Sequence, residues 1–358
     1  MPANPDTTRE AQVLVAMSGG VDSSVAASLL LEKGYRCTGL TLELFDRDEA
    51  DINDARDAAN KLGIPHKVLN CAEAFREKVI LPFIGTYEKG ATPNPCIECN
   101  RCIKFNFAFL KTMELDFDFF STGHYARIEK SGSRYLLKKA SDPQKDQSYV
   151  LYTLNQEILA RTLFPLGHLS KNEVREIAGK QNFLSAARRE SQDICFVPDG
   201  DYGSFIEEYS GKRYPPGNIL DPQGKVIGRH RGIVRYTLGQ RRGLGVAANH
   251  RVYVTAKDTE RNTITLGPES ALFSKALTAH RINLIACESM EKPIRVTAKT
   301  RYLQHEFSAW AVQSAEDEIR VEADEGQRAV TPGQAVVLYD GDTVIGGGII
   351  KQGFLPSR

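Results

Sequence analysis

Long apolar segments are missing from this chain of 358 residues. None of its hydrophobic runs approaches the roughly 20 residues that a membrane-spanning helix needs. The N-terminal stretch MPANPDTTREAQ also lacks the apolar core of a signal peptide, and its acidic residues and scarcity of arginine are unlike a transit peptide. We therefore expect a cytoplasmic protein that has no membrane partner.

A regular set of cysteine pairs and a strong net charge are missing as well. Seven cysteines, an odd number, argue against a structural disulfide framework in a cytosolic chain. Cys37, Cys71 and Cys287 stand alone in apolar or mixed stretches, which is typical of small packing residues. The net charge of +1 neither requires nor excludes a nucleic-acid partner, because a local basic patch can act where the total does not.

The composition is that of an ordinary globular protein, with 41% hydrophobic and 25% charged residues and no internal repeat or low-complexity segment. The first third alternates short apolar runs with helical patterns, which predicts a doubly wound parallel sheet covered on both faces, an α/β fold. The predicted strands are 12–17, 36–45 and 66–69, and the predicted helices are 24–33, 51–62 and 72–88.

The rest of the chain changes in character. Beyond residue 200, glycine, proline and β-branched residues become frequent, which predicts two smaller, mainly β, barrel-like antiparallel domains with a break near 267–275. We expect domains at 1–200 (with a small helical excursion near 162–188), 201–268 and 269–358, two or three domains being usual for this length. Before residue 200 we expect a loop at 92–100, a helix from Arg101, a strand at 117–121, a hairpin of 125–129 with 135–139, and a helix at 170–181 with a Ser170–Glu173 capping box.

A glycine loop, SGGVDSS at 18–24, lies between the first predicted strand and helix. Glycines let main-chain N–H groups turn inward to form a nest for an anion, and the helix N-terminus adds partial positive charge. Ser18, Ser23 and Ser24 can donate to phosphate oxygens, and Asp22 is the natural ligand for a Mg²⁺ on those phosphates. The loop has neither a Walker lysine nor a GxGxxG fingerprint. It resembles the SGGxDS loop of the ATP pyrophosphatases (PP-loop), which adenylate an oxygen while converting ATP to AMP and pyrophosphate.

Two cysteines lie where a thiol could be activated. Cys99 precedes Arg101 and a predicted helix start, and Cys195 follows Arg188 and Arg189. Positive charge or a helix N-terminus lowers a thiol pKa and so increases the reactive thiolate. Two such thiols in separate loops suit sulfur transfer, with one carrying a persulfide and the other assisting or resolving it.

The order of further motifs makes the chain similar to the bacterial tRNA-specific 2-thiouridylase (MnmA) family over nearly its whole length. Asn94-Pro95-x-x-x-Cys99-Asn100, with Lys104-Phe105 beyond, matches the family signature NPDxxCNxxIKF. The other matching stretches are LGIPH (62–66), TGHYAR (122–127), KDQSY (145–149), SQDICF (191–196), YTLGQRRGL (236–244), RY (301–302), PGQ (332–334) and GGGI (346–349).

This resemblance implies a reaction and its site residues. ATP adenylates the C2 oxygen of the wobble uridine of tRNA (of the Lys, Glu and Gln type), a persulfide on Cys195 delivers sulfur to give 2-thiouridine, and Cys99 resolves it or forms a transient disulfide. A sulfur donor such as a cysteine desulfurase or a sulfur-relay protein is implied as a partner. The implied ATP-binding residues are Ala16, Met17, Ser18, Gly19, Gly20, Val21, Asp22, Ser23, Ser24, Leu42 and Gly123. The implied tRNA-binding residues are Asn94, Pro95, Cys96, His124, Lys145, Asp146, Gln147, Arg301, Tyr302 and Gln334.

One residue departs from the family signature. Cys96 stands where the family has an aspartate near the target base, and a thiol is a poorer general base at neutral pH. Cys96 also forms a series with Cys99 and Cys102 whose spacing suits zinc or an iron–sulfur cluster. Because no second CxxC pair is present, zinc is the less favoured metal. Two alternatives stay open: a [4Fe–4S] cluster held by Cys96, Cys99 and Cys195, or Cys96 and Cys102 as inert or redox-buffering thiols.

A basic stretch, GRHRGIVRYTLGQRRGLG at 228–245, suits contacts with RNA phosphates. Tyr236 within it could stack on a base, and the alternative is a solvated strand face. Lys138, Lys139, Lys145, Lys212 and Arg213 could extend the basic surface. Two other functions stay open. One is a different PP-loop synthetase, such as a GMP synthetase, which needs no paired cysteines. The other is an RNA-binding or iron–sulfur module that does not use ATP.

Overall fold

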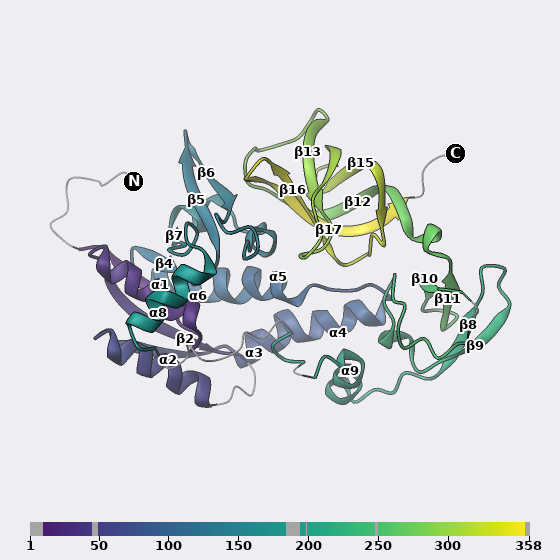
Figure 1. Cartoon of the computed structure of the whole chain (residues 1–358), viewed down its shortest axis with the longest axis horizontal. Coiled ribbons are helices and arrows are strands. Elements are labelled where there is room, and N and C mark those ends of the chain that lie inside the picture. The colour runs from purple at the N-terminus through teal and green to yellow at the C-terminus, as the bar shows by residue number, and fades with distance from the viewer. Residues whose placement is uncertain (1–9, 45–48, 184–193, 198, 248–249, 355–358) are drawn as a thin grey trace. The chain divides into compact units, whose positions relative to one another are not determined.

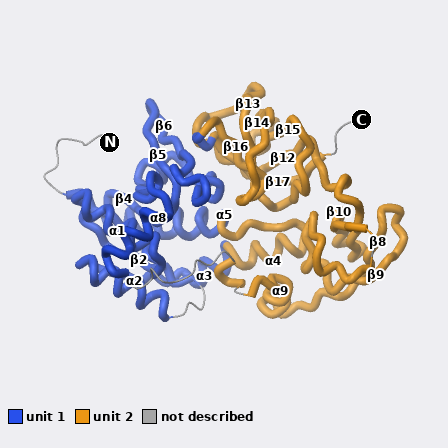
Figure 2. The backbone as a smooth tube through the Cα atoms, in the orientation of Figure 1, with its two compact units in different colours: residues 1–78, 97–191, 342–344 blue, residues 79–96, 192–341, 345–358 orange. Residues whose placement is uncertain are grey.

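The computed structural model describes residues 10–44, 49–183, 194–197, 199–247 and 250–354. It divides into two compact units, each assembled from separate stretches of the chain (Figure 2). The first unit comprises residues 1–78, 97–191 and 342–344, and the second comprises residues 79–96, 192–341 and 345–358. In the described part of the chain, no helix is long and apolar enough to cross a membrane.

A parallel sheet forms the centre of the first unit (Figure 1). Its strands are β1 (Gln12–Ala16), β2 (Arg36–Glu43), β3 (His66–Asn70), β4 (Phe119–Ser121) and β7 (Thr162–Leu163). Their order is β3-β2-β1-β4-β7, and β1 pairs in parallel with both β2 and β4. From β1 the chain adds β2 and then β3 on one side of the sheet, and it adds β4 and then β7 on the other side. The direction of strand addition thus reverses at β1, so a topological switch point lies between β1 and β4.

Helices cover this sheet on both faces. Val13 and Val15 of β1 join a core with α1 (Val21–Glu32), α2 (Glu49–Lys61) and α8 (Lys171–Lys180). On the other side Phe120 of β4 meets the ring of Phe105 edge-on. Parallel strands buried between helical layers confirm the predicted doubly wound α/β fold.

The helix that carries Cys99 differs from the prediction. It starts as α5 (Pro95–Cys99), passes through a π-helical segment (Asn100–Phe107), and ends as α6 (Ala108–Glu114). The loop predicted over 92–100 is therefore wrong for its second half, because a proline is well tolerated at the first helical position, where no N–H is needed. A second π-helical segment (Arg76–Ile80) interrupts the helix predicted at 72–88, between α3 (Ala72–Phe75) and α4 (Leu81–Glu88).

Local signals located the remaining elements of the first unit well. The predicted hairpin is β5 (Ala126–Ser131) with β6 (Arg134–Lys139), turning at Gly132, where φ is +59°. The capping box at the start of α8 is confirmed, since Ser170 and Glu173 bind each other's backbone N–H. A short helix, α7 (Gln156–Ala160), precedes β7.

The second unit contains a small sheet and a barrel. The small sheet consists of β8 (Gly217–Leu220), β9 (Val226–His230), β10 (Tyr253–Asp258) and β11 (Thr263–Gly267). Its order is β10-β11-β8-β9, and the β8–β11 pair is parallel, which corrects the expectation of purely antiparallel pairing. An additional helix, α9 (Tyr202–Ser210), was not predicted within this mainly β region.

The barrel confirms the second predicted β domain. Its strands are β12 (Phe273–Leu284), β13 (Ile294–Lys299), β14 (Phe307–Ala315), β15 (Glu318–Arg328), β16 (Ala335–Asp340) and β17 (Thr343–Phe354). They follow the order β12-β15-β14-β13-β16-β17, and β12 also pairs with β17, which closes these six strands into a barrel. Side chains such as Ile319, Val336 and Leu338 are fully buried in its interior.

Candidate active site

The glycine loop leaves the carboxyl end of β1, at the switch point where open α/β sheets bind ligands. Helix α1 begins at Val21, earlier than predicted, so Asp22, Ser23 and Ser24 form its first turn. The N-terminus of α1 therefore points its unpaired N–H groups and partial positive charge at the loop. This geometry suits an anion such as phosphate.

Two glycines of the site are required by close backbone approach. A Cβ atom at Gly19 would lie 2.5 Å from the carbonyl oxygen of Asp51, and its φ is +78°. A Cβ atom at Gly123 would lie 2.8 Å from the main-chain nitrogen of Ser23. The segment after β4 thus packs directly against the first turn of α1, which places Gly123 beside the loop.

Hydroxyl groups of the loop hold its own backbone. Ser23 and Ser24 donate to the carbonyl oxygen of Gly20 at 3.0 and 3.1 Å, and the Ser18 N–H donates to the Ser23 hydroxyl at 3.1 Å. Ser18 itself is exposed. Of the three predicted phosphate donors, Ser18 presents an exposed side chain, whereas Ser23 and Ser24 are buried.

The neighbouring strands fix the entrance of the loop. Met17 donates its N–H to the Leu40 carbonyl at 2.8 Å, and the Thr41 hydroxyl donates to the Met17 carbonyl at 2.8 Å. Ala16 ends β1, and Leu42 of β2 is only 6% exposed. Any role of Leu42 toward a nucleotide would therefore rest mainly on its backbone.

Asp22 takes part in an ion pair that the sequence did not predict. The Lys171 Nζ lies 2.7 and 2.9 Å from its two carboxylate oxygens, and Tyr125 donates its hydroxyl to Oδ1 at 2.8 Å. Lys171 begins α8, far from the loop in sequence, and is 8% exposed. Asp22, the predicted Mg²⁺ ligand, is therefore ion-paired with Lys171 in this structure. The capping signal at Ser170 located the start of α8, but no spacing connected it with the loop.

The segment from Thr122 to Gln147 is held mainly by its own contacts. Burial, with a smaller contribution from the charge of Lys104, lowers the pKa of His124 well below its usual value, so its ring is neutral. Its Nδ1 lies 2.7 Å from the Thr122 hydroxyl, and the ring packs near Phe105. A buried neutral imidazole suits packing better than the predicted contact with RNA.

In the stretch KDQ at 145–147, two side chains hold the backbone and one supplies charge. Asp146 accepts N–H bonds from Ala140 and Ser148, and Gln147 exchanges hydrogen bonds with the backbone of Tyr125. These two side chains shape the turn after the hairpin. Lys145 supplies the positive charge of this stretch.

Cys99 occupies a different environment from the one expected. It ends α5 inside a continuous helical stretch and is 8% exposed, so it is not placed before a helix N-terminus. Arg101 forms an ion pair with Glu98, whose charge offsets that of the guanidinium. The helix start predicted near Arg101 is therefore wrong, because the helix already begins at Pro95. Cys96, in the first turn of the same helix, is exposed.

Cys195 is exposed on a turn of the second unit. The next residue, Phe196, is 3% exposed and packs its ring against Phe83 of α4 and Phe205 of α9. This aromatic cluster anchors the turn and leaves the thiol at the surface. Arg188 and Arg189, which were expected to activate it, lie outside the described residues.

Two of the predicted RNA-contacting residues, Gln334 and Arg301, hold the backbone of the second unit. Gln334 donates its side-chain N–H groups to the carbonyl oxygens of Thr92 and Pro93, both at 3.0 Å. It thereby holds the segment that leads directly into Asn94 and Pro95. Arg301 donates to the carbonyl oxygens of Arg328 and Ala329, and the adjacent Tyr302 is half-buried.

The basic stretch at 228–245 contributes fewer surface groups than expected. Tyr236 is 3% exposed, so it cannot stack on a base in this conformation. Arg235 forms ion pairs with Asp201 and Glu207 of the region around α9. The predicted stacking of Tyr236 on a base is therefore wrong, whereas a phosphate contact of the ion-paired Arg235 stays a prediction.

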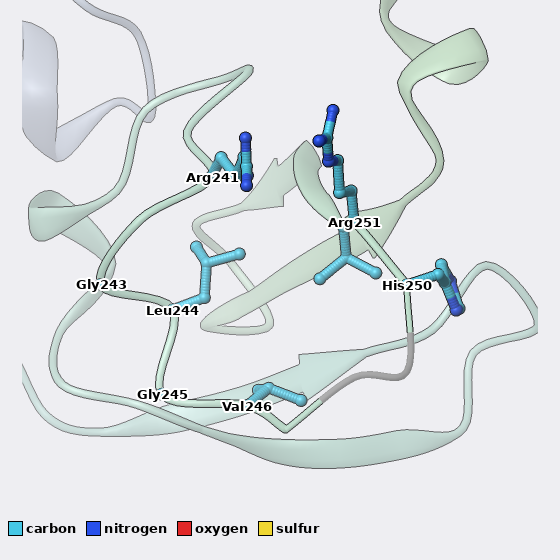
Figure 3. Close-up of a pocket in the computed structure, with 8 residues that line it drawn as sticks. Arg241, Gly243, Leu244, Gly245, Val246, His250 and Arg251 are labelled. Carbon is cyan, nitrogen blue, oxygen red and sulfur yellow. The ribbon is translucent and has the colours of Figure 1, made fainter.

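The exposed part of that stretch borders a cavity of about 610 Å³. Arg241, His250 and Arg251 line this cavity (Figure 3). Leu244 is 4% exposed and anchors the intervening chain. The cavity presents cationic side chains on a glycine-rich backbone, as phosphate binding requires.

Cysteine, histidine and carboxylate side chains are the usual protein ligands of metal ions. Among the residues that the structure describes, no three His, Cys, Asp or Glu side chains come together in a way that could hold a metal ion. Cys37 and Cys71 are buried, as expected for packing residues, and burial raises the pKa of each thiol to about 11.

A glycine loop without a Walker lysine, at the switch point of a doubly wound parallel sheet, defines the first unit as an α/β nucleotide-binding domain of the HUP, or PP-loop, class. Family models agree: "tRNA methyl transferase HUP domain" matches residues 11–199, "tRNA methyl transferase PRC-barrel domain" matches 203–268, and "Aminomethyltransferase beta-barrel domain" matches 274–350.

Curated relatives extend this likeness over nearly the whole chain. The chain is 47% identical to a protein of Acetivibrio thermocellus over 355 residues, which cover 95% of this chain and 99% of the relative. A relative from Clostridioides difficile is 46% identical over 354 residues, with 95% and 98% coverage. Both carry the name tRNA-specific 2-thiouridylase MnmA. The chain belongs to the MnmA family, which confirms the resemblance predicted from its motifs.

Proposed function

We propose that this chain is an ATP-dependent tRNA-uridine 2-sulfurtransferase that converts the wobble uridine to 2-thiouridine. The observation that carries the proposal is a match of 47% identity, over 95% of the chain, to proteins named for this activity. The glycine loop at the switch point and the exposed Cys195 support it, because they supply an anion site and an accessible sulfur.

The first half of the proposed reaction is adenylation. The loop 18–24 binds the phosphates of ATP, and the uridine C2 oxygen attacks the α-phosphate, so that pyrophosphate leaves. This turns a poor leaving group into AMP. A Mg²⁺ riding on ATP would neutralise phosphate charge, and the Asp22 carboxylate has the oxygen ligands that this ion prefers. Within the protein, Gly19 and Gly123 keep the backbone close enough to shape this site.

The second half is sulfur transfer. The terminal sulfur of a persulfide on Cys195 attacks C2, and AMP leaves with the former C2 oxygen. The thiol of Cys99 then attacks the Cys195 sulfur and releases 2-thiouridine. A disulfide between the two cysteines remains, and a cellular thiol reductant must reduce it. A desulfurase or a sulfur-relay protein would reload the persulfide. Cys99 belongs to the first unit and Cys195 to the second.

The tRNA surface in this proposal includes Lys145 in the first unit and the rim of Arg241 and Arg251 in the second. Gln334 and Arg301 act indirectly, because they bind main-chain carbonyl groups. Gln334 in particular positions the segment that enters Asn94, Pro95 and Cys96. The lysine, glutamate and glutamine tRNAs are the proposed substrates on the basis of the family.

Nucleoside mass spectrometry of tRNA incubated with ATP and a persulfide donor tests the proposal directly. The wild-type chain should form 2-thiouridine and should show tRNA-stimulated exchange of pyrophosphate into ATP. Cys195→Ser should abolish thiolation and retain the exchange, since only the sulfur nucleophile is lost. Cys287→Ser, in the same unit, should change neither and serves as the control.

The alternatives give different results in the same assays. Exchange that is stimulated by a small metabolite and not by tRNA would indicate another PP-loop synthetase. Thiolation that survives in Cys195→Ser would contradict the assignment of the sulfur carrier. The iron–sulfur alternative predicts bound iron and sulfide after anaerobic purification, whereas an iron-free protein that thiolates tRNA with persulfide alone excludes it.

A further inference from the structure

The nucleotide loop has an unusual electrostatic composition. Residues 16–24 contain one acidic residue, Asp22, and no lysine or arginine. ATP carries several negative charges, so a loop of this composition needs a cation from elsewhere in the fold. In Walker loops a lysine of the loop itself supplies that charge.

Helix α8 places a lysine at this position in space. The Nζ of Lys171 lies within 2.9 Å of both carboxylate oxygens of Asp22, which is in the first turn after the loop. A lysine that is 8% exposed has left most of its hydration, which costs free energy unless a strong partner replaces the water. The fold therefore maintains an ammonium group beside the anion-binding loop.

Several contacts orient this side chain. The Ser170–Glu173 capping box fixes the start of α8, and the Lys171 N–H donates to Asp142 at 3.1 Å. The Nζ also lies 5.7 Å from the ring centre of Tyr125, whose hydroxyl binds the same Asp22 carboxylate. Lys171 and Tyr125 thus approach one carboxylate together, from α8 and from the start of the hairpin.

We propose that Lys171 is the phosphate-binding cation of the nucleotide site, paired with Asp22 as in this structure and transferred to the phosphates of ATP when nucleotide enters. This inference rests on the proposed use of ATP and adds a residue to it. In this exchange the phosphates of ATP replace the Asp22 carboxylate as the partner of the Lys171 ammonium group. No covalent bond is formed or broken, and no proton is transferred. The exchange also leaves the Asp22 carboxylate available to a metal ion.

Nucleotide binding without catalysis tests this role. Affinities for ATP and AMP are measured by calorimetry, with melting temperatures alongside, for the wild type, Lys171→Met and Lys180→Met. Lys180 is an exposed lysine of the same helix and is the control. We expect Lys171→Met to weaken ATP binding at least tenfold and AMP binding less than threefold, since AMP lacks the outer phosphates. An equal loss for both nucleotides, in step with a lower melting temperature, would show a structural role only.

If Lys171→Met alone is unstable, a second test compares Asp22→Asn with the double variant Asp22→Asn, Lys171→Met. ATP binding is measured in EDTA, which removes metal ions. Without metal, Asp22→Asn should tighten ATP binding, because it releases Lys171 and removes a negative charge. Adding Lys171→Met to Asp22→Asn should then weaken ATP binding at least tenfold. If Lys171 only neutralises Asp22, the single and double variants will bind ATP equally. A wild type that does not bind ATP contradicts the proposed function, whereas wild-type binding that Lys171→Met leaves unchanged contradicts this inference alone.

Discussion

The nucleotide loop of the first unit and the arginine-lined cavity of the second unit are both rich in glycine, for different reasons. At Gly19 a side chain would collide with the Asp51 carbonyl oxygen at 2.5 Å. At Gly245 φ is also positive, at +69°, but among the described residues no heavy atom beyond the adjacent residues lies within 4 Å of an added Cβ. One glycine is required by contact and conformation, and the other by conformation alone.

This difference fits the two proposed ligands. Adenylation requires phosphate groups to be held in a fixed geometry, so the loop is built from short backbone contacts. RNA phosphate binding depends mainly on positive charge, and exposed arginines on a turning backbone suffice for it. Substitutions in the loop of the first unit should therefore affect ATP binding, whereas substitutions of the exposed arginines in the second unit should affect tRNA binding.

Gly19→Ala should have the largest effect. The added Cβ must displace the backbone of α2, and φ of +78° is strained for alanine, so we expect a loss of about 2–4 kcal/mol of stability and at least a 100-fold loss of ATP affinity. Gly245→Ala is the matched control and should cost about 1 kcal/mol with no change in ATP affinity. Calorimetry and thermal unfolding measure both. Equal losses of ATP affinity in the two variants would remove the proposed contrast.

The reactivity of two thiols should differ in a similar way, because Cys71 is buried in the first unit and Cys195 is exposed in the second. Cys71 is 2% exposed, and burial together with the charge of Glu43 raises its pKa to about 11, whereas Cys195 is exposed. At pH 8 we expect iodoacetamide to modify Cys195 at least 100-fold faster, because the thiolate is the reactive form. Peptide mass spectrometry measures both rates, and denaturant should equalise them.

The raised pKa of Cys71 also makes the folding stability depend on pH. The folded chain holds this proton more tightly than the unfolded chain. Its contribution is therefore fully present below the unfolded pKa, near 8.5, and is lost as the pH rises toward 11. Labelling of Cys71 that is already complete at pH 8 in the folded protein would contradict both the burial and the shift.

Removing the exposed charge should give an intermediate effect. Arg241→Ala with Arg251→Ala should weaken tRNA binding about tenfold and make the slope of log K against log salt shallower by roughly 1–2. Arg235→Ala is the control within the same stretch. Its guanidinium is paired with Asp201 and Glu207, so this variant should lower the melting temperature and leave the salt slope unchanged. A salt slope that only Arg235→Ala alters would overturn the assignment.

Sequence patterns predicted the parallel sheet, the hairpin and the capped helix α8, because each depends on short-range signals. They failed at Pro95, where proline was taken as part of a loop although it begins a helix. That error changed the expected environment of Cys99. Long-range partners were also out of reach, since nothing in the spacing joins Lys171 to Asp22, 149 residues apart.

Burial and ion pairing give several residues of the site a role that the sequence did not predict. Tyr236, His124 and Arg235 are residue types that bind RNA, and their positions in matching motifs made that use plausible. In the structure each is buried or ion-paired within its own unit. A motif identifies which residues a family retains, but only packing separates those that touch a ligand from those that hold the backbone.

The smallest expected effect compares two helix caps. Ser170 caps α8 in the first unit, and Asp201 caps α9 in the second by accepting the Ser204 N–H at 3.0 Å. Replacing either with alanine should cost about 1 kcal/mol of stability. Only Ser170→Ala should also weaken ATP binding, by about two- to threefold, because Lys171 follows the cap directly. Ser170→Asp keeps an acceptor at the cap and should restore most of both losses. If Asp201→Ala reduced ATP affinity as much as Ser170→Ala, the effect on ATP would reflect general destabilisation, and the placement of Lys171 by its cap would be disproved.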